Sequence, residues 1–213
     1  GIEPSSYHVV DIDDDGDDDV VVGTDDFTEE SLVLLINDGA GVFTAQAIES
    51  TSSVVRSVNG ISSGDLNGDG NTDLVIVISG KCFSYLQGEN LSFSRTELLS
   101  TIDIFRSVAV ADFNGDQRAD FVVGDNSSDG INLYLNDGMD TPGFTESAVS
   151  SIRPVFSLSA QDLNRDGDVD LVASNGEVYA FENEIEQVPP VGVFTITLQE
   201  AAVFPNPVGE GYV

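Results

Sequence analysis

The chain repeats one acidic nine-residue pattern four times. Each copy opens with Asp, has Asp or Asn at its third position and Asp at its fifth, and closes with Asp at its ninth. The copies occupy residues 11–19, 65–73, 112–120 and 162–170. Oxygen-bearing side chains at alternate positions of a tight loop suit a hard divalent cation, since Ca²⁺ takes ~6–8 oxygen ligands at ~2.3–2.6 Å. Four copies in register therefore constrain the fold as well as the chemistry.

The copies also mark a repeat of nearly constant length. They start at residues 11, 65, 112 and 162, so successive copies are 54, 47 and 50 residues apart. A period of ~50 residues is typical of stacked supersecondary units. Each unit contains short apolar, β-branched runs without helical periodicity, and turn sequences such as Asn37-Asp38-Gly39 and Asn136-Asp137-Gly138 separate these runs.

These runs predict about four strands in each unit. The first strands are expected at 7–10, 58–62, 108–111 and 156–160, and the second at 20–22, 74–78, 121–123 and 171–173. The third are expected at 32–36, 82–86, 131–135 and 178–181, and a fourth in three units at 43–48, 92–98 and 144–149. We therefore predict an all-β fold, a β-propeller-like array of four blades of about four antiparallel strands each, with a Ca²⁺ loop between strands one and two of each blade.

The last part of the chain is the irregular one. We expect the blades to fill residues 1–187, as about 1–50, 51–100, 101–150 and 151–187, and residues 188–213 to form a Pro-containing strand or linker tail. Within that tail, residues 193–198 alternate like a strand. This segment either completes the fourth blade or leaves the domain to pair elsewhere, and the pattern alone does not choose between the two.

The composition argues against a nucleic-acid partner and against a membrane span. Only 7 Lys and Arg stand against 38 Asp and Glu, for a net charge of −31, so a nucleic-acid partner is not expected because that binding rests on Lys and Arg. So acidic a chain should carry bound cations in its folded state. No apolar stretch is long enough for a membrane span. We expect an extracellular or cell-surface location, where calcium is plentiful.

No motif favours an enzyme. Residues 60–64 match G-x-S-x-G, but this pattern needs a strand–turn–helix context and a histidine partner, and the only histidine of the sequence is His8. We therefore predict no catalytic residues and no organic cofactor. The EF-hand is also rejected, because it requires Glu at the twelfth loop position and flanking helices. The twelfth residues here are Val22, Ile76, Val123 and Ala173.

The loop pattern and its flanking strands resemble the FG-GAP/VCBS repeat family, which includes the integrin α-subunit propeller. The resemblance covers roughly residues 5–185. It implies Ca²⁺ in the loop of each blade and roles in adhesion or extracellular recognition. Two departures stand out. Family propellers usually close with seven blades, whereas four are countable here, and Gln117 stands where the family has Gly.

The resemblance implies side-chain ligands at loop positions one, three, five and nine, and a backbone carbonyl at position seven. Carried over, the first site is Asp11, Asp13, Asp15, Asp17 and Asp19, and the second is Asp65, Asn67, Asp69, Asn71 and Asp73. The third is Asp112, Asn114, Asp116, Arg118 and Asp120, and the fourth is Asp162, Asn164, Asp166, Asp168 and Asp170. The alternative is that the loops are Asp-rich turns capped by their own side chains, without metal.

Of up to four Ca²⁺ sites, the third is predicted to be the weakest. Gln117 must adopt a turn conformation that Gly adopts at lower cost, and Arg118 adds a positive charge nearby. A calorimetric Ca²⁺ titration in which the third site bound as tightly as the others would contradict this prediction. Bound ions should tie each loop together and so stabilise the folded chain.

Three functions agree with these observations. The leading hypothesis is a non-catalytic, extracellular, calcium-stabilised adhesion or structural repeat module with a protein or glycan ligand. The second is the protomer of a self-assembling extracellular filament, joined to its copies by strand addition through the C-terminal tail. The third is a carbohydrate-binding part of a secreted polysaccharide-active enzyme. Residues 203–208, Val-Phe-Pro-Asn-Pro-Val, also resemble the opening of a type IX secretion C-terminal sorting domain.

Overall fold

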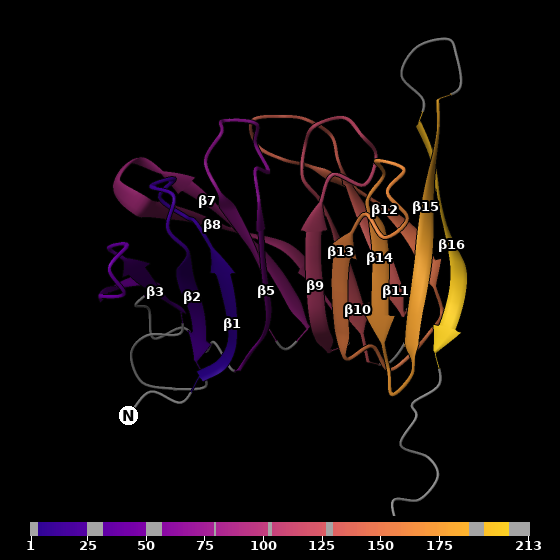
Figure 1. The fold of residues 1–213 in the computed structure, drawn as a ribbon, viewed down its shortest axis with the longest axis horizontal. Helices are drawn as coiled ribbons and strands as arrows, with labels where there is room; N and C mark the ends of the chain where they lie inside the picture. The colour runs from indigo at the N-terminus through magenta and orange to yellow at the C-terminus, as the bar shows by residue number, and fades with distance from the viewer. Residues whose placement is uncertain are drawn as a thin grey trace, which may run out of the picture.

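The computed structural model describes residues 4–24, 32–49, 57–78, 80–101, 104–126, 130–187 and 194–204. These residues form four antiparallel sheets of four strands each, and in every sheet the strands follow chain order (Figure 1). The predicted all-β array of four four-stranded blades is confirmed. Each acidic loop lies between the first and second strands of its sheet, where it was predicted.

The strand bounds define the blades. Blade one contains β1 (Pro4–Val10), β2 (Asp19–Thr24), β3 (Leu32–Asn37) and β4 (Phe43–Glu49). Blade two contains β5 (Val58–Gly64), β6 (Asp73–Ile78), β7 (Lys81–Gly88) and β8 (Ser92–Ser100), with a 3₁₀ turn η1 (Glu89–Leu91) between the last two. Blade three contains β9 (Phe105–Ala111), β10 (Asp120–Asp125), β11 (Ile131–Asn136) and β12 (Phe144–Ser150). Blade four contains β13 (Ser157–Gln161), β14 (Asp170–Ser174), β15 (Val178–Gln187) and β16 (Phe194–Phe204).

The fourth blade extends further than its predicted boundary at residue 187. β16 pairs with β15 from Gln187↔Phe194 to Val178↔Phe204, so residues 194–204 belong to the blade and not to a tail. The alternating segment thus completes its own sheet, because the β15–β16 ladder supplies the partners that its backbone needs. Of the segment 203–208 that resembles a sorting domain, residues 205–208 lie outside the described part of the chain.

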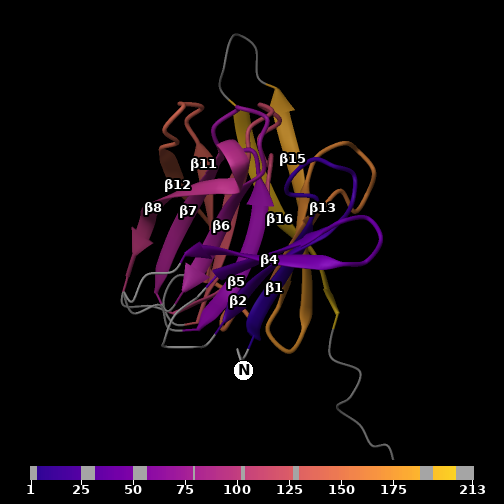
Figure 2. The ribbon, with the colours of Figure 1, turned by 90° about the vertical axis from the view of Figure 1, so that its left-hand side faces the viewer.

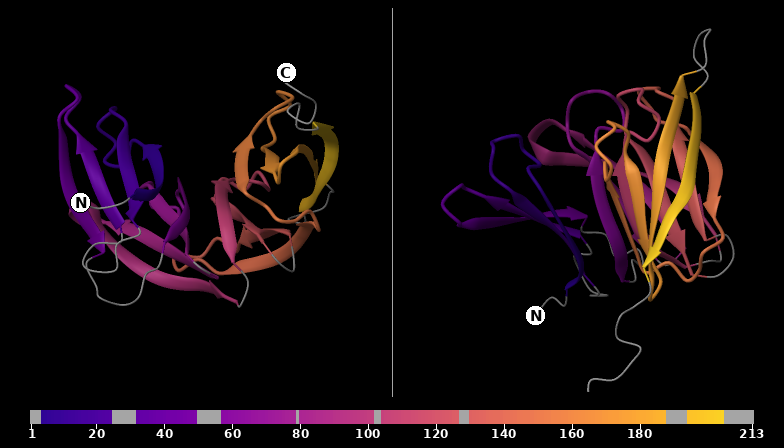
Figure 3. Two further views of the ribbon diagram at one scale, coloured as in Figure 1. Left: turned by 90° about the horizontal axis from the view of Figure 1, so that it is seen from below. Right: turned by 45° about the vertical axis from the view of Figure 1, so that its right-hand side comes forward.

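The blades stand side by side in an arc (Figure 3). The first strands are innermost, with β1 against β5, β5 against β9 and β9 against β13. Seen from the side in Figure 2, successive sheets lie face to face. Among the described residues, β13 and β1 do not approach each other as the other pairs do, and Figure 3 shows an opening between the first and fourth blades.

The hydrophobic core lies between the blades, in three separate clusters. Each cluster joins two consecutive blades, for example Ile12 and Val21 of blade one with Ile61 and Ile76 of blade two. β6 and β10 are buried along their whole length, since a blade covers each of their faces. That burial on both sides explains the continuous apolar run of Leu74–Ile78, which does not alternate with polar residues.

Candidate metal centres

The first Asp of each loop holds the loop in its turn. In loop one (residues 11–19), the backbone N–H of Gly16 donates to Asp11 Oδ2 at 2.9 Å, and that of Asp15 donates to Asp11 Oδ1 at 3.2 Å. The fifth residue acts alike, because the N–H of Asp17 donates to Asp15 Oδ1 at 3.0 Å. Loops two (65–73), three (112–120) and four (162–170) have the same bonds from their sixth and seventh residues. The sequence folds locally this way because Asp side chains accept from nearby backbone N–H groups.

Two residues of each loop have left-handed backbone conformation. The sixth position has φ of 94° at Gly16, 85° at Gly70, 70° at Gln117 and 100° at Gly167. The expected conformation of Gln117 is therefore confirmed. The fourth position is also left-handed, and sequence reasoning missed it because Asp14 (φ 59°) and Arg165 (φ 68°) stand there beside the glycines of the other two loops.

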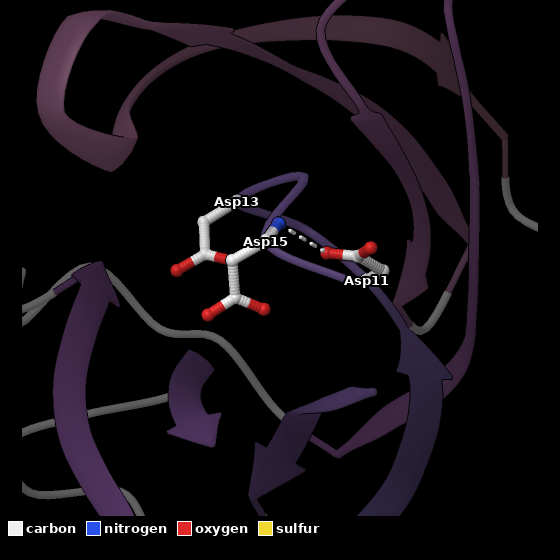
Figure 4. A group of neighbouring side chains, drawn as sticks. All are labelled: Asp11, Asp13 and Asp15. Atoms are coloured by element: carbon white, nitrogen blue, oxygen red, sulfur yellow. Dashed lines mark hydrogen bonds between the residues drawn. The ribbon is translucent and has the colours of Figure 1, made fainter. Parts of the chain in front are cut away.

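Loop one gathers three carboxylates. One carboxylate oxygen each from Asp11, Asp13 and Asp15 lies within 4.8 Å of the others, and Figure 4 shows the three side chains turned toward one region. The pKa of Asp13 is raised by desolvation and by the negative charges of Asp15 and Asp19. Three mutually repelling carboxylates offer only oxygen ligands, so they fit Ca²⁺.

Loops two to four have a neutral amide in the third position. Asn67, Asn114 and Asn164 each donate from Nδ2 to the fifth Asp, at 3.0, 2.9 and 2.7 Å. The third and fifth residues of these loops are therefore joined by a hydrogen bond, whereas in loop one both of these residues are carboxylates. Because the number of charged ligands tunes Ca²⁺ affinity, loop one should bind the cation most tightly.

The ninth Asp has a second role that sequence reasoning missed. Asp19, Asp73, Asp120 and Asp170 are all fully buried. Asp120 accepts from the N–H of Phe113 at 3.0 Å and of Asn136 at 2.8 Å, and so ties its loop to the end of the third strand. The other three make equivalent pairs of bonds. Its place among the Ca²⁺ ligands stays a prediction, and Asp19 lies outside the group formed by Asp11, Asp13 and Asp15.

Burial governs the protonation of two of these residues. Desolvation raises the pKa of Asp73 to about 6 and that of Asp120 to about 7, although each carboxylate accepts two backbone N–H bonds that lower it. A nearby cation would favour the charged form instead.

Arg118 does not lie over its own loop. Its Nη1 donates to the carbonyl oxygen of Asn67 in loop two at 3.4 Å, and its guanidinium also lies beside Gly68 and Gly138. Its charge is thus brought to loop two, contrary to the expectation that it weakens the third site. The predicted weakness of that site now rests on Gln117 alone.

Replacing Gln117 with Gly is expected to stabilise the chain and to raise Ca²⁺ affinity at the third loop. The left-handed conformation costs a residue with a Cβ roughly 1–2 kcal/mol, and Gly avoids this cost. Urea unfolding and calorimetric titration would measure the two effects. The matched control is Gly167→Gln, which should destabilise the chain by a similar amount. An unchanged or lower stability for Gln117→Gly would contradict the prediction.

The histidine and the G-x-S-x-G segment discussed above make contacts between blades. His8 Nε2 and Ser63 Oγ are 2.9 Å apart, joining blade one to blade two, and burial lowers the pKa of His8. Ser62 lies within β5 and accepts the N–H of Val110 at 3.0 Å. Residues 60–64 thus belong to a strand, and the strand–turn–helix context of a nucleophile elbow is not formed there.

A model of the FG-GAP-like repeat matches residues 11–76 and 112–173, which is more than half of the chain and includes all four acidic loops. The chain belongs to the FG-GAP-like repeat family. Its FG-GAP loops are the four Asp-rich segments described above. None of the curated proteins compared with the chain matches it. No helix among the described residues could cross a membrane.

One of the solved structures that share this fold aligns with most of the chain. It is the structure of an Agrocybe aegerita lectin that specifically recognises non-reducing terminal N-acetylglucosamine. The TM-score is 0.60 and the sequence identity 18%, over 92% of this chain and 50% of the lectin chain. The chain thus spans about half the length of that lectin. At this identity the similarity establishes the fold and no more.

Proposed function

We propose that the chain is an extracellular, calcium-stabilised and non-catalytic recognition module of the FG-GAP type. The observation that carries the proposal is the convergence of Asp11, Asp13 and Asp15 in loop one. The hydrogen bond from the seventh N–H to the fifth Asp of that loop recurs in the other three loops. A net charge of −31 supports it as well, because cations offset the repulsion among the carboxylates.

Calcium would act on the structure and not in a reaction. Bound in the loops, it supplies positive charge that holds neighbouring carboxylates together. The chain's own residues do the rest: the first and fifth Asp accept loop N–H groups, and the ninth Asp joins the loop to the third strand. An arc in which every blade has an acidic loop between its first and second strands suits the display of a binding surface.

A pocket beside loop one has a lining that suits a polar ligand. The pocket, of about 330 Å³, lies between loops one and two, where it is lined by Asp13 and Asn71. The end of β7, at Gln87 and Gly88, and η1 (Glu89–Leu91) complete its lining. Gln87 Oε1 is buried and has no hydrogen-bond partner. Amides and carboxylates beside an apolar side chain are groups that recognise sugar hydroxyls, so we propose a glycan as the ligand.

A glycan array in Ca²⁺ buffer tests the proposed ligand. The first probes are oligosaccharides that end in non-reducing N-acetylglucosamine. Glu89→Gln should weaken binding at least about tenfold, the loss expected from one charge-assisted hydrogen bond. The control is Glu182→Gln, an exposed residue of blade four, which should bind like the wild type. Absence of any bound glycan, or unchanged binding by Glu89→Gln, would rule out the proposed site.

A further inference from the structure

The same interface recurs between every pair of consecutive blades. Each blade has an outgoing face toward the next blade, and positions on it are counted from the first Asp of the blade's acidic loop. The outgoing face consists of the second residue of the loop and of the residues of the second strand that lie ten and twelve positions after that Asp. Each blade also has an incoming face toward the preceding blade. This face consists of the residues of the first strand that lie seven and four positions before the same Asp, and of the residues of the second strand that lie nine and eleven positions after it. In blade two the outgoing face is Leu66, Val75 and Val77, and the incoming face is Val58, Ile61, Leu74 and Ile76.

At both ends of the arc, one such face is not covered by any described part of the chain. The second loop residue is 2%, 0% and 0% exposed at Ile12, Leu66 and Phe113, but 45% exposed at Leu163 of blade four. At the other end, Tyr7 of blade one is 73% exposed, whereas its equivalents Ile61, Val108 and Leu158 are 8%, 5% and 8% exposed.

The second strands show the same asymmetry. In β14 the incoming residues Leu171 and Ala173 are buried, while the outgoing Val172 and Ser174 are only half-buried. In β2 the pattern is reversed, because Val21 on the outgoing face is buried and Val20 and Val22 on the incoming face are half-buried. The arc therefore ends in one free outgoing face and one free incoming face.

A hydrogen bond that crosses two of the three interfaces has no equivalent among the described residues at either end of the arc. Asn136 Nδ2 donates to the carbonyl oxygen of Leu66 in the preceding blade at 2.7 Å, and Asn183 Nδ2 donates to that of Phe113 at 2.8 Å. The equivalent residue of blade one is Asn37, whose Nδ2 reaches only Asp18 O of its own loop, at 3.2 Å. The equivalent acceptor on blade four is the Leu163 carbonyl, which accepts no hydrogen bond from a described residue.

The two free faces are complementary in size and in charge. Inside the chain, Gly23 on the outgoing face of blade one lies against Val58 on the incoming face of blade two. The equivalent residues on the free faces are Ser174 of blade four and Pro4 of blade one, and both are small. At the loops, Arg118, the seventh loop residue of blade three, lies over Gly68, the fourth loop residue of blade two. The free ends offer Arg165 at the fourth position and Asp17 at the seventh, which carry opposite charges.

We propose that the outgoing face of blade four binds the incoming face of blade one of a second copy of this chain. The contact repeats the interface already formed three times within the chain. Leu163 enters the site that Leu66 and Phe113 occupy in the internal interfaces, against Tyr7 of the second copy. Asn37 of the second copy donates to the Leu163 carbonyl, and Arg165 faces Asp17. The association is head-to-tail, so each copy uses two different surfaces.

Sedimentation velocity of the 213-residue chain in Ca²⁺ buffer tests the proposal. The wild-type chain should associate as its concentration rises. Leu163→Glu and Tyr7→Glu should each weaken self-association at least about tenfold, because each places a charge in an apolar contact. Both positions are exposed in the single chain, so both variants should fold, with unchanged circular dichroism and with melting temperatures that still rise in Ca²⁺.

Mixing the two variants distinguishes a head-to-tail contact from any other. Leu163→Glu retains an intact incoming face and Tyr7→Glu an intact outgoing face, so an equimolar mixture should form a dimer although neither variant does so alone. Met139→Glu, at a 62% exposed turn residue remote from both faces, is the control and should associate like the wild type. A wild-type chain that stays monomeric at every concentration, or a mixture that does not dimerise, would overturn the proposal.

Discussion

Removal of Ca²⁺ with EDTA is expected to lower the melting temperature of this chain by about 20 °C or more. A ligand that binds only the folded state contributes ~2.7 kcal/mol per site at a concentration of 100 Kd, and ~1 kcal/mol shifts the melting temperature of a chain of this size by ~2–4 °C. With four FG-GAP loops, the contributions add up to most of the stability of an ordinary domain.

Thermal unfolding at a series of free Ca²⁺ concentrations measures this effect. Mg²⁺ at the same concentrations is the control, and it should stabilise far less because it demands octahedral geometry and dehydrates reluctantly. A melting temperature that EDTA leaves unchanged would show that the loops are turns capped by their own side chains, the metal-free alternative.

Asp120→Asn is expected to destabilise the Ca²⁺-loaded chain by about 3 kcal/mol or more. Asp120 is 0% exposed, and its two carboxylate oxygens accept the backbone N–H groups of Phe113 and Asn136. An amide offers only one oxygen, so one buried N–H would face the NH₂ group and lose its acceptor. The loss comes in addition to any loss of a Ca²⁺ ligand.

Asp116→Asn separates these two contributions. Asp116 is an exposed ligand candidate of the same loop, and its Oδ1 accepts the N–H of Arg118 at 2.9 Å. Both variants remove one negative charge from loop three, so urea unfolding in saturating Ca²⁺ should show Asp120→Asn to be less stable than Asp116→Asn by about 2 kcal/mol. Equal stabilities would mean that Asp120 contributes only as a ligand.

Much of the blade plan is local and could be predicted from the sequence. The spacing of the Asp-rich loops located the blades, and the Gly pattern at the sixth position identified Gln117 as a residue forced into left-handed conformation, with φ of 70°. These predictions succeed because a tight turn and a short strand depend on residues a few positions apart. The left-handed conformation of the fourth loop position was not predicted, because Asp14 and Arg165 occupy it in two loops and only the other two loops have Gly there.

Contacts between residues far apart in the chain could not be predicted in this way. The turn sequence Asn136-Asp137-Gly138 indicated a hairpin, but not that Asn136 donates to Leu66 of the preceding blade, 70 residues away. Arg118 looked like part of loop three and instead contacts loop two. The assignment of residues 194–204 to the fourth sheet likewise needed the pairing of β15 with β16.

By itself, the sequence determined the number of blades, the acidic loops and the oxygen-only chemistry of those loops, because each is written within a single repeat. The tertiary structure alone decided what each repeat contacts. It showed that the ninth Asp ties its loop to the third strand, and that Leu163 and Tyr7 stay exposed where equivalent residues are buried. The physical reason is that burial and hydrogen bonding depend on the neighbouring blade, and a repeat does not encode whether a neighbour is present.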